Sequence, residues 1–194
     1  RLKYKSKEEM YKALGAEQID GVALAIRNIE RGTGIIIGDQ TGVGKGRQAA
    51  AIIRYGNMQG LSPIFLTEKP NLFTDLYRDL DGIGYGDIKP FIVNSTGEKF
   101  KGVYRGKEVV YKAPSQSDKD HKMMLKIGQI PNDAKVILAT YSQFSSERYV
   151  DKINFLKAMS HNNIIILDES HNASGQGNTS TLFQQLLPET KGVV

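Results

Sequence analysis

The chain alternates short apolar runs with longer segments in which apolar residues recur every three or four positions. Within residues 16–30, this spacing places five apolar side chains on one helical face: Ile19, Val22, Ala23, Ile26 and Ile29. Similar spacing or composition predicts further helices at 7–14, 47–58, 70–80 and 149–160. A last short helix is expected to begin at a cap on Thr179 or Ser180 and to run through Leu187.

The apolar runs between these helices are too short for helices and are typical of buried strands. They lie at Ile35–Ile37, Pro63–Thr67, Pro90–Asn94, Lys135–Thr140 and Asn163–Leu167. Fully apolar strands that alternate with helices predict an α/β fold, with a mostly parallel central sheet and helices on both faces. A chain of 194 residues fits one such domain.

Residues 95–130 depart from this rhythm. Their sequence predicts a hairpin that turns at Arg105-Gly106, followed by a polar, mobile loop over 113–122. The segment holds eight Lys and Arg against four Asp and Glu, and so carries much of the chain's net charge of +5. Such a segment is either a footprint for a phosphate backbone or a solvated insertion, and lysine content alone does not decide between them.

Residues 38–46 read Gly-Asp-Gln-Thr-Gly-Val-Gly-Lys-Gly, between a predicted strand and a predicted helix. The frame from Gly38 to Gly44-Lys45 is that of a phosphate-binding loop, in which backbone amides and the lysine hold a nucleoside triphosphate. The next position ordinarily carries Ser or Thr to hold Mg²⁺, but here it is Gly46.

A second motif follows the strand run at 163–167 and reads Asp168-Glu169-Ser170-His171. Two adjacent carboxylates at the carboxyl end of a buried strand form the Walker B arrangement. In that arrangement, the aspartate holds Mg²⁺ and the glutamate orients the attacking water. Together the two motifs predict an ATPase.

The composition of the chain excludes several kinds of site and partner. The chain has no cysteine, which excludes disulfides, zinc–thiolate sites and thiol catalysis. No apolar run approaches the ~18 residues of a membrane span, so no membrane partner is expected. We expect an intracellular protein, cytoplasmic in a bacterium or an infected cell and nuclear in a eukaryote. The sequence starts without Met and stops within an apolar run, as a fragment would.

The ordered motifs resemble those of the first RecA-like domain of superfamily 2 helicases, and more narrowly the strawberry notch family. In that family the phosphate loop contains the sequence Gly-Lys-Gly-Arg, which is also the sequence of residues 44–47 here. Further matches are Leu66-Thr67, Ala139-Thr140-Tyr141-Ser142 and Leu167 to Asn172. The resemblance spans roughly residues 16–194 and implies a RecA-like P-loop NTPase domain.

The resemblance also implies a role for each matching position. ATP and Mg²⁺ are the implied cofactors, with Lys45 and Glu169 catalytic and Asp168 the metal ligand. The implied nucleotide-binding residues are Gln18, Gln40, Thr41, Gly42, Val43, Gly44, Lys45, Gly46 and Arg47. Gln18 would read adenine, whereas Arg47 either reaches phosphate or forms a salt bridge. The implied nucleic-acid and coupling residues are Thr67, Thr140, Tyr141 and His171. Most of these residues could instead have only a structural role, on a helix surface, at a strand end or in a loop.

The implied activity is that of a motor domain that couples ATP hydrolysis to movement on nucleic acid, with DNA the expected partner. A second RecA-like domain, outside this chain, would supply an arginine finger. The isolated chain is therefore expected to turn ATP over poorly and to unwind nothing. Two alternatives stay open: a P-loop ATPase that does not act on nucleic acid, and a degenerate module that binds nucleotide without hydrolysing it.

Overall fold

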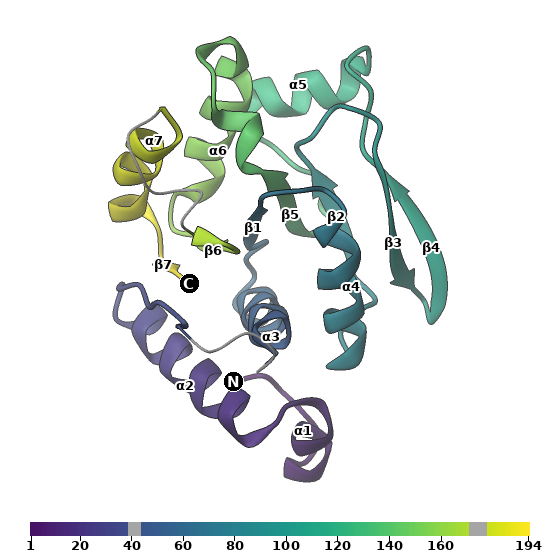
Figure 1. Ribbon diagram of the computed structural model, residues 1–194, viewed down its shortest axis with the longest axis vertical. Helices are drawn as coiled ribbons and strands as arrows, with labels where there is room; N and C mark the ends of the chain where they lie inside the picture. Colours follow the sequence, from purple (N-terminus) through teal and green to yellow (C-terminus); the bar gives the residue numbers. More distant parts are fainter. Residues whose placement is uncertain (39–43, 171–177) are drawn as a thin grey trace.

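The computed structural model describes residues 1–38, 44–170 and 178–194 (Figure 1). The α-helices are α1 (Lys7–Ala13), α2 (Ala16–Glu30), α3 (Lys45–Met58), α4 (Leu72–Gly82), α5 (Lys119–Ile127), α6 (Val150–Ser160) and α7 (Asn178–Leu186). The strands are β1 (Ile64–Thr67), β2 (Lys89–Ile92), β3 (Lys99–Tyr104), β4 (Lys107–Lys112), β5 (Ala134–Thr140), β6 (Ile164–Leu167) and β7 (Gly192–Val193). Short 3₁₀ turns lie at Tyr141–Phe144, Glu147–Tyr149 and Leu187–Glu189.

Five of the described strands form a parallel sheet in the order β2-β5-β1-β6-β7. Its side chains alternate between two apolar clusters, as the two-residue period of a strand requires. On β1, Phe65 packs with α2, α3 and α4, while Ile64 and Leu66 pack with α5, α6 and α7 on the other face. Both faces of the sheet are thus covered by helices, and the predicted fold class is confirmed.

The predicted hairpin is confirmed as β3 and β4, which pair in antiparallel register and lie beside α4 (Figure 1). Arg105 and Gly106 both have positive φ, of 53° and 71°, as a two-residue hairpin turn with the twist of its strands requires. The inner face is fastened by Phe100, whose ring lies 5.4 Å from that of Phe73 and 5.8 Å from that of Tyr77.

The predicted strand Ile35–Ile37 is wrong in this structure. The segment is irregular and pairs with β7 through one bond, from the amide of Ile35 to the carbonyl of Val193 at 2.9 Å. Ile36 is 88% exposed. Because β7 has only two residues, it offers too few backbone N–H and C=O groups to extend the pairing further.

The predicted mobile loop over 113–122 is also corrected, because α5 begins within it at Lys119. The Asp118 side chain caps this helix by accepting from the amide of His121 at 3.0 Å, and Gly128 ends it with φ 66°. These flanking residues were the available signal, but the surrounding charge obscured the apolar face. The expected caps Thr179 and Ser180 instead lie inside α7, which begins at Asn178.

Within the described residues, no helix combines the length and the apolar character that crossing a membrane requires.

Candidate functional site

The candidate site lies at the carboxyl edge of the sheet, where parallel strands bring their ends together. Thr67 ends β1 and pairs in register with Thr140, which ends β5. Asp168 follows β6 and donates its amide to the carbonyl of Leu66 at 2.9 Å. Three residues that are far apart in the sequence therefore meet at one edge.

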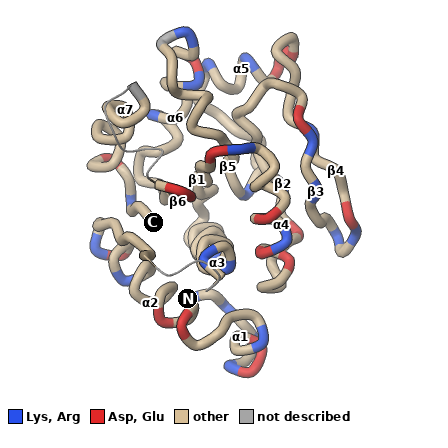
Figure 2. The backbone as a smooth tube through the Cα atoms, viewed as in Figure 1, with Lys and Arg blue, Asp and Glu red and all other residues tan. Residues whose placement is uncertain are grey.

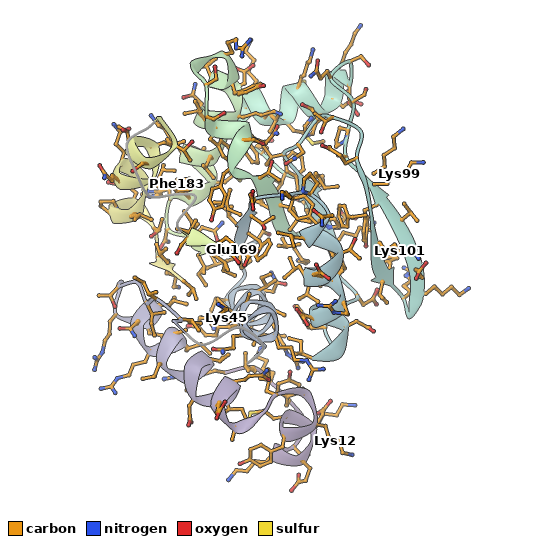
Figure 3. The ribbon with its side chains drawn as sticks, in the orientation of Figure 1. Lys12, Lys45, Lys99, Lys101, Glu169 and Phe183 are labelled. Carbon is orange, nitrogen blue, oxygen red and sulfur yellow. The ribbon has the colours of Figure 1, made fainter. Side chains whose placement is uncertain are left out.

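Lys45 is the first residue of α3 and is exposed. Gly44 before it has φ 80°, a backbone region in which glycine carries no steric penalty. The amides of Arg47 and Gln48 donate to the carbonyl of Gly44, so the helix is formed from its first turn. Its earlier amides have no intrahelical acceptor by geometry and give this end the partial positive charge that attracts anions. Figure 3 shows Lys45 and Glu169 in the central part of the molecule.

Asp168 is held by two hydroxyl groups. The Thr67 hydroxyl donates to its Oδ2 at 2.9 Å, and the Tyr141 hydroxyl donates to its backbone carbonyl at 2.8 Å. Burial raises the pKa of Asp168 above its usual value, while the Thr67 hydrogen bond and the nearby charge of Lys45 oppose that shift. The carboxylate is thus held in position, and it feels the charges of both Lys45 and Glu169.

Glu169 has a φ of 53°, in the left-handed region that costs a non-glycine residue ~1 kcal/mol or more. Strain of this kind tends to persist at functional sites, where the surrounding structure enforces it. The turn leaves Glu169 exposed, while its neighbour Asp168 is partly buried. The two adjacent carboxylates therefore occupy different environments, and their expected roles as metal ligand and general base stay predictions.

Gln18 lies beside the beginning of α3. Its Oε1 accepts from the amide of Gly15 at 3.0 Å, and its Nε2 donates to the carbonyl of Gly44 at 3.4 Å. Residues 15–18 line a surface pocket of about 370 Å³. The structure thus places the residue expected to read adenine next to the phosphate loop, although its contact with a base stays a prediction.

Gly46 lies against α4 rather than against open space. A Cβ atom added to it would lie 2.0 Å from Oδ2 of Asp79, so the Asp79 carboxylate fills the volume of a side chain at position 46. Arg47 donates to the carbonyl of Ala13 at 3.2 Å, which ties α3 to the end of α1. Sequence reasoning missed Asp79 because the position it packs against, Gly46, has no side chain to signal a contact.

The expected nucleic-acid residues Thr67, Thr140 and Tyr141 are all buried and engaged within the protein. The amide of Thr140 donates to Oδ1 of Asn94 at 3.1 Å, and its hydroxyl lies 2.9 Å from that of Ser142. Direct contact with a nucleic-acid backbone stays a prediction. The sequence analysis had not singled out Asn94, although a polar residue that ends an apolar run was a usable signal.

Five of the predicted site residues lie outside the described part of the chain: Gln40, Thr41, Gly42, Val43 and His171.

The described residues fit a nucleoside triphosphate with Mg²⁺. The start of α3 and the exposed Lys45 suit phosphate oxygens, and the Asp168 carboxylate is the kind of oxygen ligand that Mg²⁺ prefers. Within the same described residues, no group of three or more acidic or histidine side chains forms a ready-made metal cage. Mg²⁺ usually binds through one or two carboxylates together with phosphate and water, and Asp168 could supply one such carboxylate.

A family model described as "P-loop containing NTP hydrolase pore-1" matches residues 3–187. The match covers both the phosphate-loop and the Asp-Glu motifs. No curated protein matches the chain.

Proposed function

The chain belongs to the family of P-loop-containing NTP hydrolases described as pore-1, and from this premise we propose that it is an ATP-driven motor domain acting on nucleic acid. More narrowly, we assign it to the strawberry notch-like group of superfamily 2 helicases and translocases. DNA is its expected substrate, and a second RecA-like domain is its expected catalytic partner.

In this proposal, the chain's own residues divide the work of hydrolysis. Glu169 orients a water molecule and accepts its proton as the oxygen attacks the γ-phosphorus. Lys45 compensates the charge that develops as the bond from that phosphorus to the bridging oxygen breaks, releasing ADP and phosphate. Asp168 would hold Mg²⁺, which when bound neutralises charge on the β- and γ-phosphates.

One observation supports the motor proposal above others. Thr67 and Tyr141, expected at the nucleic-acid side, both donate hydrogen bonds to Asp168, the expected metal ligand. A displacement of the ends of β1 or β5 would therefore move Asp168 directly. An ATPase that does not move along nucleic acid has no evident need for this link.

The test is ATP turnover by this chain and by a longer chain extended through a second RecA-like domain, each with and without DNA or RNA. We expect the longer chain to be stimulated by one nucleic acid, and Glu169→Gln to lose that stimulated turnover. Turnover indifferent to every nucleic acid would favour another class of ATPase. No turnover in either chain would favour a binding module.

A further inference from the structure

A second pocket of about 390 Å³ lies between α5 and α6, and its residues differ from those of the nucleotide site. The pocket is lined by Ser95, Ser115, Gln116, His121, Lys122, Leu125, Arg148, Tyr149, Asp151 and Lys152. The segment after β2 contributes Ser95, and α6 contributes Lys152 from its first turn. The pocket therefore combines residues that follow a strand with residues of two helices.

Lys152 is the unusual member of this pocket. It is 8% exposed, and its Nζ donates to Oγ of Ser95 at 2.8 Å and to Oε1 of Gln143. Among the side chains that the structure describes, no carboxylate forms an ion pair with it. Burial lowers the pKa of Lys152 to about 8. A buried ammonium held only by neutral acceptors is costly, and an anion beside it would offset that cost.

The charges around Lys152 are mostly of its own sign. Arg148 and Lys122 also line the pocket, against a single lining carboxylate, Asp151. Glu98 acts on Lys152 only as a favourable charge outside ion-pair contact. His121 adds little charge, because burial lowers its pKa. The net charge at the pocket is therefore positive.

We infer that this pocket is a binding site for a phosphate group, with Lys152 as its buried cation. A tetrahedral phosphate has several strong acceptor oxygens and can bind the ammonium of Lys152, the guanidinium of Arg148 and the hydroxyl of Ser95 together. A planar carboxylate offers two oxygens and would leave more of these donors without an acceptor. The inference rests on the pocket and does not depend on the motor function proposed above.

Two sources would supply the same chemistry: the phosphodiester backbone of a nucleic acid, or a free phosphate or phosphomonoester. Ser95 in the pocket wall follows β2, and Gln143, which holds Lys152, follows β5, so the pocket lies near the same carboxyl edge as the nucleotide site. Figure 2 shows further Lys and Arg on α5 and on the β3–β4 hairpin. A backbone crossing this edge would therefore meet further positive charge on α5 beside the pocket.

The first arm of the test is the melting temperature of the 194-residue chain in inorganic phosphate, against sodium chloride at equal ionic strength. We expect phosphate at about ten times its dissociation constant to raise the melting temperature by about 3 °C. Because the start of α3 could also bind phosphate, the comparison is made in a Lys45→Ala background, where Lys152→Met should abolish the increase. Lys157→Met, which removes an exposed lysine from the same helix, should retain it.

The second arm measures the binding of single-stranded DNA and RNA oligonucleotides by fluorescence anisotropy. Binding roughly tenfold weaker in Lys152→Met, with Lys157→Met unchanged, would identify a backbone phosphodiester as the source. A lost phosphate response with unaltered oligonucleotide binding would identify a free phosphate or phosphomonoester. If Lys152→Met responds to phosphate and binds oligonucleotides as the parent does, the inference is overturned.

A second variant guards against loss of folding in Lys152→Met. Ser95→Ala with Arg148→Gln removes two donors from the pocket while leaving Lys152 in place. We expect it to weaken the phosphate response severalfold. An unchanged response in this folded double variant would equally overturn the inference. ATP turnover of the same variants is a separate readout, so failure here is distinguishable from failure of the motor proposal.

Discussion

Single hydroxyl groups determine how the acidic residue of the site is presented. Thr67 is completely buried, and its one described side-chain hydrogen bond goes to Asp168. Valine has nearly the same shape and could occupy the same buried space, so packing alone does not require the hydroxyl. The role of this hydroxyl is therefore its hydrogen bond to Asp168 and not its packing.

Thr67→Val is expected to weaken the binding of a Mg²⁺–nucleotide complex about tenfold. The variant keeps the side-chain shape but removes a hydrogen bond to a charged group, typically ~1.5–3 kcal/mol. Isothermal titration calorimetry with a non-hydrolysable ATP analogue measures the change. Thr190→Val is the matched control, since that hydroxyl donates only to the carbonyl of Leu187. Equal affinities for parent and Thr67→Val would contradict this account of Asp168.

Lys152 should make the stability of the chain depend on alkaline pH. Its pKa of about 8 in the folded chain lies below the ordinary 10.5, so the unfolded chain binds more protons between these values. Stability therefore rises with pH through that window. Relative to Lys152→Met, the parent should gain about 2 kcal/mol in unfolding free energy between pH 7 and pH 10. Urea denaturation at both pH values measures it, and a constant difference would show that Lys152 is not desolvated.

At the scale of elements, the contact between α3 and α4 explains why position 46 carries glycine and not the Ser or Thr that is usual in a phosphate loop. The Asp79 carboxylate lies where a side chain at position 46 would lie, and its pKa is raised by burial. The two helices approach closely here because one of them has no side chain at the contact. A hydroxyl residue in this position would compete with α4 for space.

Restoring the common phosphate-loop residue should therefore be harmful. Gly46→Thr is expected to lower the unfolding free energy by about 1 kcal/mol or more, because Asp79 must rotate away. Adding Asp79→Ala should recover most of the loss, with Asp79→Ala alone as the reference. Urea denaturation of the four chains gives the coupling energy. A Gly46→Thr chain as stable as the parent would show that the contact is not restrictive.

The elements that periodicity predicts well are those with an apolar face or a fully apolar run. The helix at 16–30 and the strands around 64–67 and 164–167 were predicted within a residue or two of their observed bounds. α5 was missed because three lysines and two aspartates in and just before it mask an apolar face centred on Leu125. Ile35–Ile37 was overpredicted because apolar content does not reveal whether a neighbouring strand is long enough to pair with it.

In the candidate site, too, some features could be inferred from the sequence and others could not. Lys45, Asp168 and Glu169 could be proposed from the sequence, because a loop or strand end must carry those residue types for that chemistry, and their roles stay predictions. The Thr67–Asp168 and Asp79–Gly46 contacts could not, since each joins elements whose relative placement only the folded sheet and helices determine. Lys152 in its pocket is a further case, because an isolated lysine in a helix ordinarily lies in solvent.

For the molecule as a whole, nucleotide binding should be visible as added stability. A Mg²⁺–nucleotide complex at 100 times its dissociation constant should stabilise the folded chain by about 2.7 kcal/mol and raise its melting temperature by about 5 °C or more. Lys45→Ala should remove this shift. Lys12→Ala, an exposed lysine on α1 (Figure 3), should retain it. A full shift in Lys45→Ala would place nucleotide elsewhere on the chain.

The single bond between Ile35 and Val193 joins the segment that enters the phosphate loop to the last strand of the chain. During synthesis, the loop and its helix are made early, whereas this neighbour in the sheet is made much later. The edge beside the phosphate loop therefore stays incomplete until residues 192–194 have left the ribosome, and nucleotide binding should tighten only from that point of synthesis onward.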